Sequence, residues 1–96
     1  MEEYKSNLLF LSSCIGGWES VNSNPDIYIF QGNDGDYYLL AYSYDKEYER
    51  GSFFYYDIAW DEEGCFIRMG IKRYRLSEEK CPYGLHIGTW GSYMRN

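Results

Sequence analysis

The sequence predicts an all-β fold, a small antiparallel up-and-down barrel of about eight strands with a short N-terminal helix. From Trp18 onward, apolar and polar residues alternate with the period of two that is typical of strands. Turn residues interrupt these runs at short intervals, and no helical pattern stands between them. Aromatic residues make up 21% of the chain, which suits pleated surfaces. Strands joined by successive hairpins form a meander, and eight of them can close into a barrel.

The length of 96 residues indicates one domain, residues 1–96, with the helix in 1–15 and the strands in 17–95. Residues 3–14 are expected to form this helix. Apolar residues recur at helical spacing in and just after it and should form one face: Tyr4, Leu8, Leu11 and Ile15. Gly16 and Gly17 then end the helix, because glycine tolerates positive φ.

The segment from Leu11 to Cys14 has the form of a lipoprotein cleavage box. The residues before it are acidic, however, and the apolar run is shorter than a signal peptide requires. We therefore expect a short helix that plugs the fold, and whether the box is processed stays open.

Each expected strand is bounded by turn residues. Gly32-Asn33-Asp34-Gly35 and Asp61-Glu62-Glu63-Gly64 are the hairpin signals, since Asn, Asp and Gly accept turn conformations. Residues 45–51 are expected to form a charged loop, and residues 77–84 a second loop. The expected strands are 18–21, 27–30, 37–44, 53–60, 65–69, 71–76, 85–89 and 91–95.

The formal net charge of −6 argues against general binding to nucleic acid or to anionic membranes. No apolar stretch is long enough to span a membrane. The three cysteines, Cys14, Cys65 and Cys81, match no disulfide framework, which favours reduced thiols in a cytoplasmic protein.

A Gly-x-Trp sequence at the first strand, after a short helix, carries a resemblance to a known family. With Gly16 and Trp18 at the two positions, it resembles the opening signature of lipocalins and other calycins. In that family the tryptophan packs across the closed end of the barrel, under a basic residue of the last strand. The resemblance implies that Arg95 takes that role through a cation–π contact.

A second resemblance covers nearly the whole chain. It rests on Gly17-Trp18-Glu19-Ser20, Asn24-Pro25, Gly64-Cys65-Phe66-Ile67 ahead of Gly70, and the ending Gly91-Ser92-Tyr93-Met94-Arg95. The chain is similar to a family of small proteins of unknown function from gut bacteria, often carried on conjugative elements. The resemblance implies a miniature lipocalin-like barrel and no established activity.

The sequence carries no catalytic or metal-binding motif, so we expect no enzyme, metal or cofactor. His86 and Cys81 are spaced unlike any nucleophile pair, and no third group orients them. The cysteines lack the close knuckle spacing of structural zinc sites. The paired acids Glu62-Glu63 and Glu78-Glu79 and the acids Asp34 and Asp36 fall in turns, where a solvated rim is expected.

Two charged features need a structural explanation. Asp57 lies within an expected strand and should point outward, because an inward carboxylate would need a partner. Basic and aromatic residues interleave farther along, a mixture that can stack bases but here is expected to protect a hairpin edge. That mixture comprises Arg68, Lys72, Arg73 and Arg75 with Phe66 and Tyr74.

The strongest functional signal in the sequence is that one face of each central strand is aromatic. The residues of this face are Tyr28, Phe30, Tyr38, Tyr42, Phe54, Tyr56 and Trp60, with Leu40 and Ile58. Three interpretations are open. The side chains fill the narrow interior, line a shallow cup for an apolar ligand, or form an outward patch for a partner.

The expected function is a non-enzymatic binding module that holds a small apolar or aromatic ligand in the barrel mouth. The alternative is a protein–protein interaction or structural protein that uses an acidic, tyrosine-rich surface. It would act as a homodimer or with a partner, in the service of a mobile genetic element.

Overall fold

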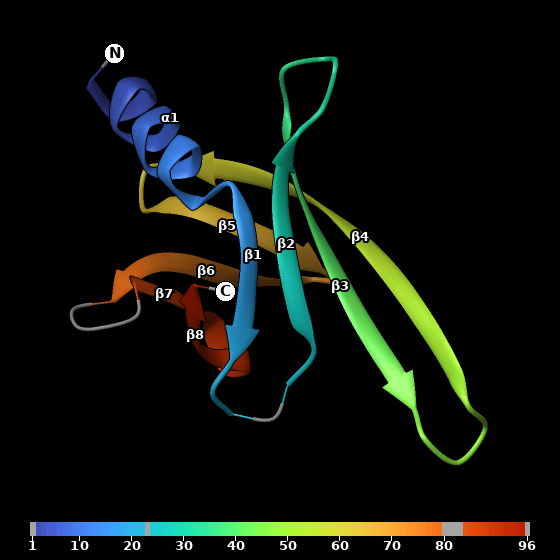
Figure 1. Cartoon of the computed structure of the whole chain (residues 1–96). Coiled ribbons are helices and arrows are strands. Elements are labelled where there is room, and N and C mark those ends of the chain that lie inside the picture. Colours follow the sequence, from blue (N-terminus) through green and yellow to red (C-terminus); the bar gives the residue numbers. More distant parts are fainter. Residues whose placement is uncertain (1, 23, 80–83, 96) are drawn as a thin grey trace.

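A computed structural model gives the fold and describes residues 2–22, 24–79 and 84–95. One helix precedes eight strands that close into an antiparallel barrel in chain order (Figure 1). The predicted fold class is therefore confirmed. The elements are α1 (Glu2–Cys14), β1 (Gly16–Ser20), β2 (Asp26–Gln31), β3 (Tyr37–Asp45), β4 (Arg50–Asp61), β5 (Gly64–Met69), β6 (Lys72–Glu79), β7 (Gly84–Ile87), a 3₁₀ turn (Gly88–Trp90) and β8 (Gly91–Arg95).

The first and last strands close the ring. β1 pairs with β2 on one side and with β8 on the other, where Trp18 lies opposite Arg95 and Ser20 opposite Tyr93. The remaining neighbours are joined by successive hairpins, as a meander requires. Closure removes the two free edges that an open eight-stranded sheet would expose.

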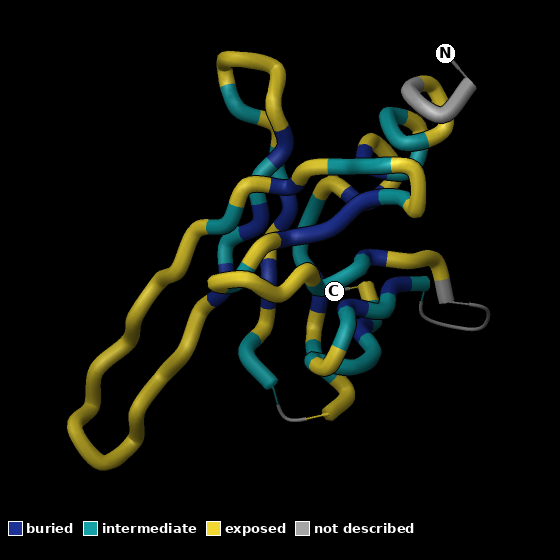
Figure 2. The backbone as a smooth tube through the Cα atoms, turned by 180° about the vertical axis from the view of Figure 1, so that it is seen from behind, coloured by how far each residue is buried: buried dark blue, intermediate teal, exposed yellow. Residues whose placement is uncertain are grey.

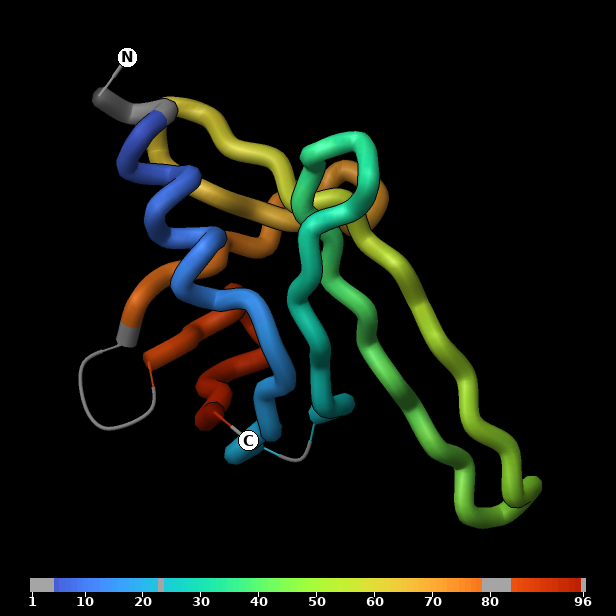
Figure 3. Tube along the Cα trace, turned by 45° about the horizontal axis from the view of Figure 1, so that its top comes forward, coloured from blue at the N-terminus to red at the C-terminus, as the bar shows by residue number. Residues whose placement is uncertain are grey.

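Helix α1 plugs one side of the barrel through Leu11, which is fully buried, and through Cys14 at its last turn. Ile15, expected on the same face, lies beyond the helix and is exposed, because the chain has already turned toward Gly16 and β1. The side chain of Tyr4 lies outside the described part of the chain. The tip of the β3–β4 hairpin points away from the helix (Figures 1 and 3).

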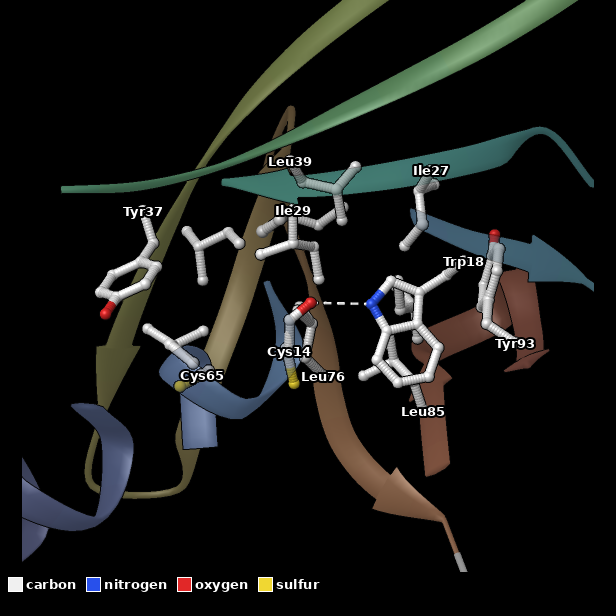
Figure 4. Packing of buried hydrophobic residues seen from close by; sticks show 14 of the residues in the cluster. Cys14, Trp18, Ile27, Ile29, Tyr37, Leu39, Cys65, Leu76, Leu85 and Tyr93 are labelled. Carbon is white, nitrogen blue, oxygen red and sulfur yellow. Dashed lines mark hydrogen bonds between the residues drawn. The ribbon is translucent and has the colours of Figure 1, made fainter. Parts of the chain in front are cut away.

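The core is mostly aliphatic. Ile27 and Ile29 of β2 and Leu39 of β3 point inward toward Trp18 and Cys14 (Figure 4). The other members of this buried cluster are Leu11, Tyr37, Ala41, Ile58, Cys65, Ile67, Leu76, Leu85, Ile87 and Tyr93. Side chains of this size fill an eight-stranded interior, which has room for little else.

For β2 and β3, the prediction that the aromatic side chains point into the barrel is wrong. Along β2, Ile27 and Ile29 are buried, and along β3 the buried residues are Tyr37, Leu39 and Ala41. The alternate positions therefore face outward, and these include Tyr28, Phe30, Tyr38 and Tyr42. Both faces of these strands are apolar, so alternation alone does not assign the inner face; the narrow interior accepts the aliphatic set.

The charged loop predicted for residues 45–51 is shorter than expected. The turn occupies residues 46–49, and Arg50 and Gly51 already belong to β4 opposite Asp45 and Tyr44. The longer pairing carries the β3–β4 ribbon past the barrel. Every residue from Tyr42 to Tyr55 is exposed (Figure 2), and we call this ribbon the arm.

Candidate functional site

The three residues predicted to close the barrel lie together. The indole Nε1 of Trp18 donates to the carbonyl oxygen of Cys14 at 2.8 Å (Figure 4), and the side chain is only 4% exposed. The guanidinium carbon of Arg95 lies 4.1 Å from the ring centroid. Gly16 has φ of +127°, and a Cβ there would approach Arg95 Nη1 to 3.0 Å.

Arg95 also joins the last strand to the end of the helix. Its Nη1 donates to the carbonyl oxygen of Ile15 at 2.7 Å, and its Nη2 to that of Ser13 at 2.5 Å. The same guanidinium therefore covers Trp18 and satisfies carbonyl groups at the helix C-terminus, where a cation is favoured.

The seven residues predicted to line a ligand cup do not surround a common space. Tyr28 and Tyr42 are exposed on the outside, and the rings of Phe30 and Tyr38 stack there with centroids 5.6 Å apart. Their predicted place inside the barrel mouth is wrong, because the inward positions of β2 and β3 belong to the aliphatic set.

The other three predicted residues share the inner face of β4 with Ile58 but are separated along the strand. Phe54 lies in the arm and is exposed, since β4 has left the barrel at that point. Tyr56 packs edge-on against Trp90, with centroids 5.8 Å apart. Trp60 packs against the core. These side chains extend the core toward the arm and do not complete a mouth.

The outward rings of β2, β3 and β4 form a continuous surface that we call the aromatic face. It comprises Tyr28, Phe30, Tyr38, Tyr42, Tyr44, Phe53 and Tyr55. Tyr42 and Phe53 face each other across the arm with centroids 4.9 Å apart. Phe53 is 59% exposed and Tyr55 68%. Contiguous exposed apolar patches are typical of interaction sites on soluble proteins.

Gly51 makes room for one of these rings. A Cβ at Gly51 would lie 2.8 Å from Cε2 of Tyr42, so the ring of Tyr42 rests on the glycine backbone. Cross-strand contacts of this kind stabilise a two-stranded ribbon that has no core beneath it. The arm therefore holds its rings in place while leaving them accessible.

The aromatic face is also acidic. Residues 26–57 contain seven acidic and two basic side chains, a net charge of −5 in a chain of −6. Asp57 is exposed, on the outward face of β4 opposite Tyr38, where the sequence places it. Tyr38 donates to the Asp34 carboxylate at 2.5 Å, which raises the pKa of Tyr38 to about 12.

Part of the predicted basic and aromatic mixture forms a self-contained cluster on β5 and β6, whereas Tyr74 lies on the other face of the sheet, against Trp90. Phe66 is buried beneath guanidinium groups, with Arg73 and Arg75 at 4.6 Å and 5.0 Å from its centroid. Arg75 donates two hydrogen bonds to Asp61, at 2.5 Å and 2.7 Å, and Arg73 donates one at 2.6 Å. These arginines are therefore engaged within the chain.

The hydrogen bonds from Arg75 hold the pKa of the Asp61 carboxyl well below its usual range. A carboxyl whose pKa is lower in the folded chain stabilises the fold above the unfolded pKa of about 4, and loses that effect as pH falls further. We expect Asp61→Asn to lower the thermal unfolding midpoint at pH 7, with the difference from the parent narrowing below about pH 4.

Circular dichroism melts at several pH values measure this. Glu62→Gln is the matched control, because it removes the same charge one residue away at an exposed position. A constant difference between Asp61→Asn and the parent across the acid range would contradict the role assigned to the ion pair.

The described thiols are buried. Burial raises the pKa of the Cys14 thiol and that of Cys65, the latter to about 11. Such thiols are poor nucleophiles at neutral pH. Among the described residues, no group of three His, Cys, Asp or Glu side chains is able to hold a metal ion. Cys81, considered with His86, lies outside the described residues.

The chain belongs to the family described as "Domain of unknown function, B. Theta Gene description (DUF3876)", whose model matches residues 1–95. This confirms the expected membership in a family of unknown function. Neither the curated proteins nor the solved structures yield a match. In the described part of the chain, no helix is long and apolar enough to cross a membrane.

Within the arm, the sequence singles out Tyr42 and Phe54 but not Phe53 and Tyr55. An aromatic run with large rings at both parities, Phe53-Phe54-Tyr55-Tyr56, marks them in retrospect. Tyr37 and Tyr38 also place rings on both faces of β3 within the barrel, so such a run does not by itself show that β4 continues beyond the barrel.

Proposed function

We propose that this protein is a non-enzymatic interaction module that docks another protein on its aromatic face and arm. One observation carries the proposal: the ribbon from Tyr42 to Tyr55 is exposed along its whole length while it displays aromatic rings. Tyrosine and phenylalanine are enriched at protein interfaces, where they supply contact area at low entropic cost. The alternative function drawn from the sequence is thus the one we favour.

The geometry gives less support to a ligand held in the barrel mouth. The inward side chains of β2 and β3 are tightly buried, and the seven expected lining residues are divided between the outer surface, the arm and the core edge. A hollow of about 450 Å³ beside the arm is lined by polar and charged groups as well as rings: Ser43, Asp45, Tyr48, Arg50, Ser52 and Phe54. That mixture suits a protein surface better than an apolar ligand.

The proposal has three further parts: the chain is related to the calycins, it is located in the cytoplasm, and it serves a mobile genetic element. The stacked Trp18 and Arg95 below a closed barrel support the kinship. The thiols of Cys14 and Cys65, free and buried, support a reducing compartment. The link to a mobile element rests on the family resemblance alone.

A photo-crosslinking amino acid placed at position 55 tests the interaction. We expect irradiation in the native host to give a discrete adduct of defined mass, because Tyr55 is a highly exposed ring of the docking surface. Position 71 is the matched control: Ile71 is 100% exposed and hydrophobic, but it lies in the β5–β6 turn. Adducts at both positions alike, or at neither, would contradict the proposal.

A further inference from the structure

One edge of the arm has no neighbouring strand in the described part of the chain. On one side, β3 pairs with β4 from Arg50 to Ile58. On the other side, β5 pairs with β4 only from Ile58 to Asp61. Residues 50–57 therefore present an open strand edge. Such an edge is a template for an extended segment from another chain, bound by main-chain hydrogen bonds.

The rings beside this edge have no cationic partner among the described residues. The arginine-over-ring contacts of the described chain all lie on Phe66 or Trp18. The outward face of the edge instead carries Phe53, Tyr55 and the Asp57 carboxylate, in a region of net charge −5. A partner complementary to it must be positively charged and able to stack.

The protein itself shows which side chain meets both requirements. Arg75 and Arg73 of β6 lie over the ring of Phe66 in β5 while donating to the Asp61 carboxylate at the end of β4. A guanidinium stacks on a ring and donates to a carboxylate at once, whereas an ammonium is a strongly hydrated point charge. Lysine is therefore the weaker candidate.

Resting on the proposed function, we propose that the partner protein supplies an extended segment of alternating arginine and apolar residues. This segment adds as a strand along Arg50–Asp57. Side chains of neighbouring strands on one face lie about 5 Å apart, so its arginines stack on Phe53 and Tyr55 and pair with Asp57. Its apolar residues face the other side, beside Ser52 and Phe54. Nucleic acids and anionic lipids are disfavoured by the acidic face.

Fluorescence anisotropy with the full chain and a labelled, end-capped eight-residue Arg-Val repeat tests this. The Arg-Val peptide is expected to bind at least about fivefold more tightly than a Lys-Val repeat, and a Glu-Val repeat is expected not to bind. Two further peptides carry N-methyl groups, one on every arginine and one on every valine. Only alternate N–H groups of an added strand point at the neighbouring strand. One of the two N-methylated peptides should therefore bind at least about tenfold more weakly than the unmethylated peptide, and the other should bind almost as tightly.

Variants of the chain locate the peptide. Phe53→Ser combined with Tyr55→Ser should weaken binding at least about tenfold, and Asp57→Asn about fivefold. Ile71→Ser is the matched control and should not change binding, and unfolding curves should show that the barrel of every variant is still folded. Equal loss from both N-methylated peptides, or binding unaffected by the Phe53 and Tyr55 changes, would overturn the inference.

The two proposals fail differently. A discrete adduct at position 55 without any Arg-Val binding would overturn the arginine-rich strand and leave the interaction module standing. Light scattering could instead show dimers that form through the arm and that the Arg-Val peptide does not disrupt. That result would also overturn the arginine-rich strand, because the partner would then be a second copy of this chain. Absence of the adduct at position 55 would contradict both the interaction module and the arginine-rich strand.

Discussion

Replacing Trp18 by alanine is expected to lower the free energy of unfolding by about 4 kcal/mol. The indole is nearly fully buried, its N–H is bonded to the Cys14 carbonyl oxygen, and its ring is covered by Arg95. Removing it leaves a cavity at the place where β1 meets both β8 and the end of α1. Three elements therefore lose packing together, in a chain with a small core.

Urea denaturation measures this loss. Trp18→Phe is the control, since it keeps an aromatic ring under Arg95 but gives up the indole hydrogen bond, and it should cost about half as much. Combining Trp18→Ala with Arg95→Ala tests the stacking, because each change alone removes the contact and the two losses should therefore not be additive. A loss below about 1 kcal/mol for Trp18→Ala would mean that the indole is solvated, against the structure.

The second large effect distinguishes the two faces of β3 with one chemical change. Leu39 is fully buried in the core, whereas its neighbour Leu40 lies half-buried on the outside. Leu39→Ala is expected to cost about 3 kcal/mol, and Leu40→Ala about 1 kcal/mol. The two variants remove the same atoms, so the difference reports the inner face directly.

Unfolding curves of both leucine variants, compared with the parent, give that difference. A larger cost for Leu40→Ala than for Leu39→Ala would indicate that Tyr38, Leu40 and Tyr42 point inward. Equal costs would indicate a flattened sheet in which neither face is internal.

Much of the fold could be predicted because local residues determine it. The hairpins at Gly32–Gly35 and Asp61–Gly64 follow from turn residues that few other structures accommodate. The switch from helical spacing to alternation predicts a first strand from Trp18, and β1 begins two residues earlier, at Gly16. These features are set within a few residues, so no knowledge of distant contacts is needed.

The inner face could not be predicted in the same way. Tyr28 and Ile29, or Tyr38 and Leu39, offer an apolar side chain to either side of the sheet. The choice depends on the width of the closed barrel and on the volume that Trp18 and Leu11 already occupy, which are properties of the whole chain.

The candidate site depends on the same long-range information. The aromatic excess was evident in the sequence, but the length of β4 relative to β5 decides that Phe53 and Tyr55 leave the barrel. Pairing beyond the barrel is supported by Tyr42 and Phe53 across the arm and by the space at Gly51. No local motif encodes that a ribbon is longer than its neighbours.

Residue-resolved amide hydrogen exchange tests the central claim, a closed barrel with an arm standing outside it. Amides of β1 and β8 around the Trp18–Arg95 pair should be as protected as those of β2 and β7, because closure buries them. Amides from Ser43 to Ser52 should exchange much faster, since a two-stranded ribbon without a core is marginally stable. Rapid exchange across β1 and β8 together with strong protection of residues 43–52 would contradict it.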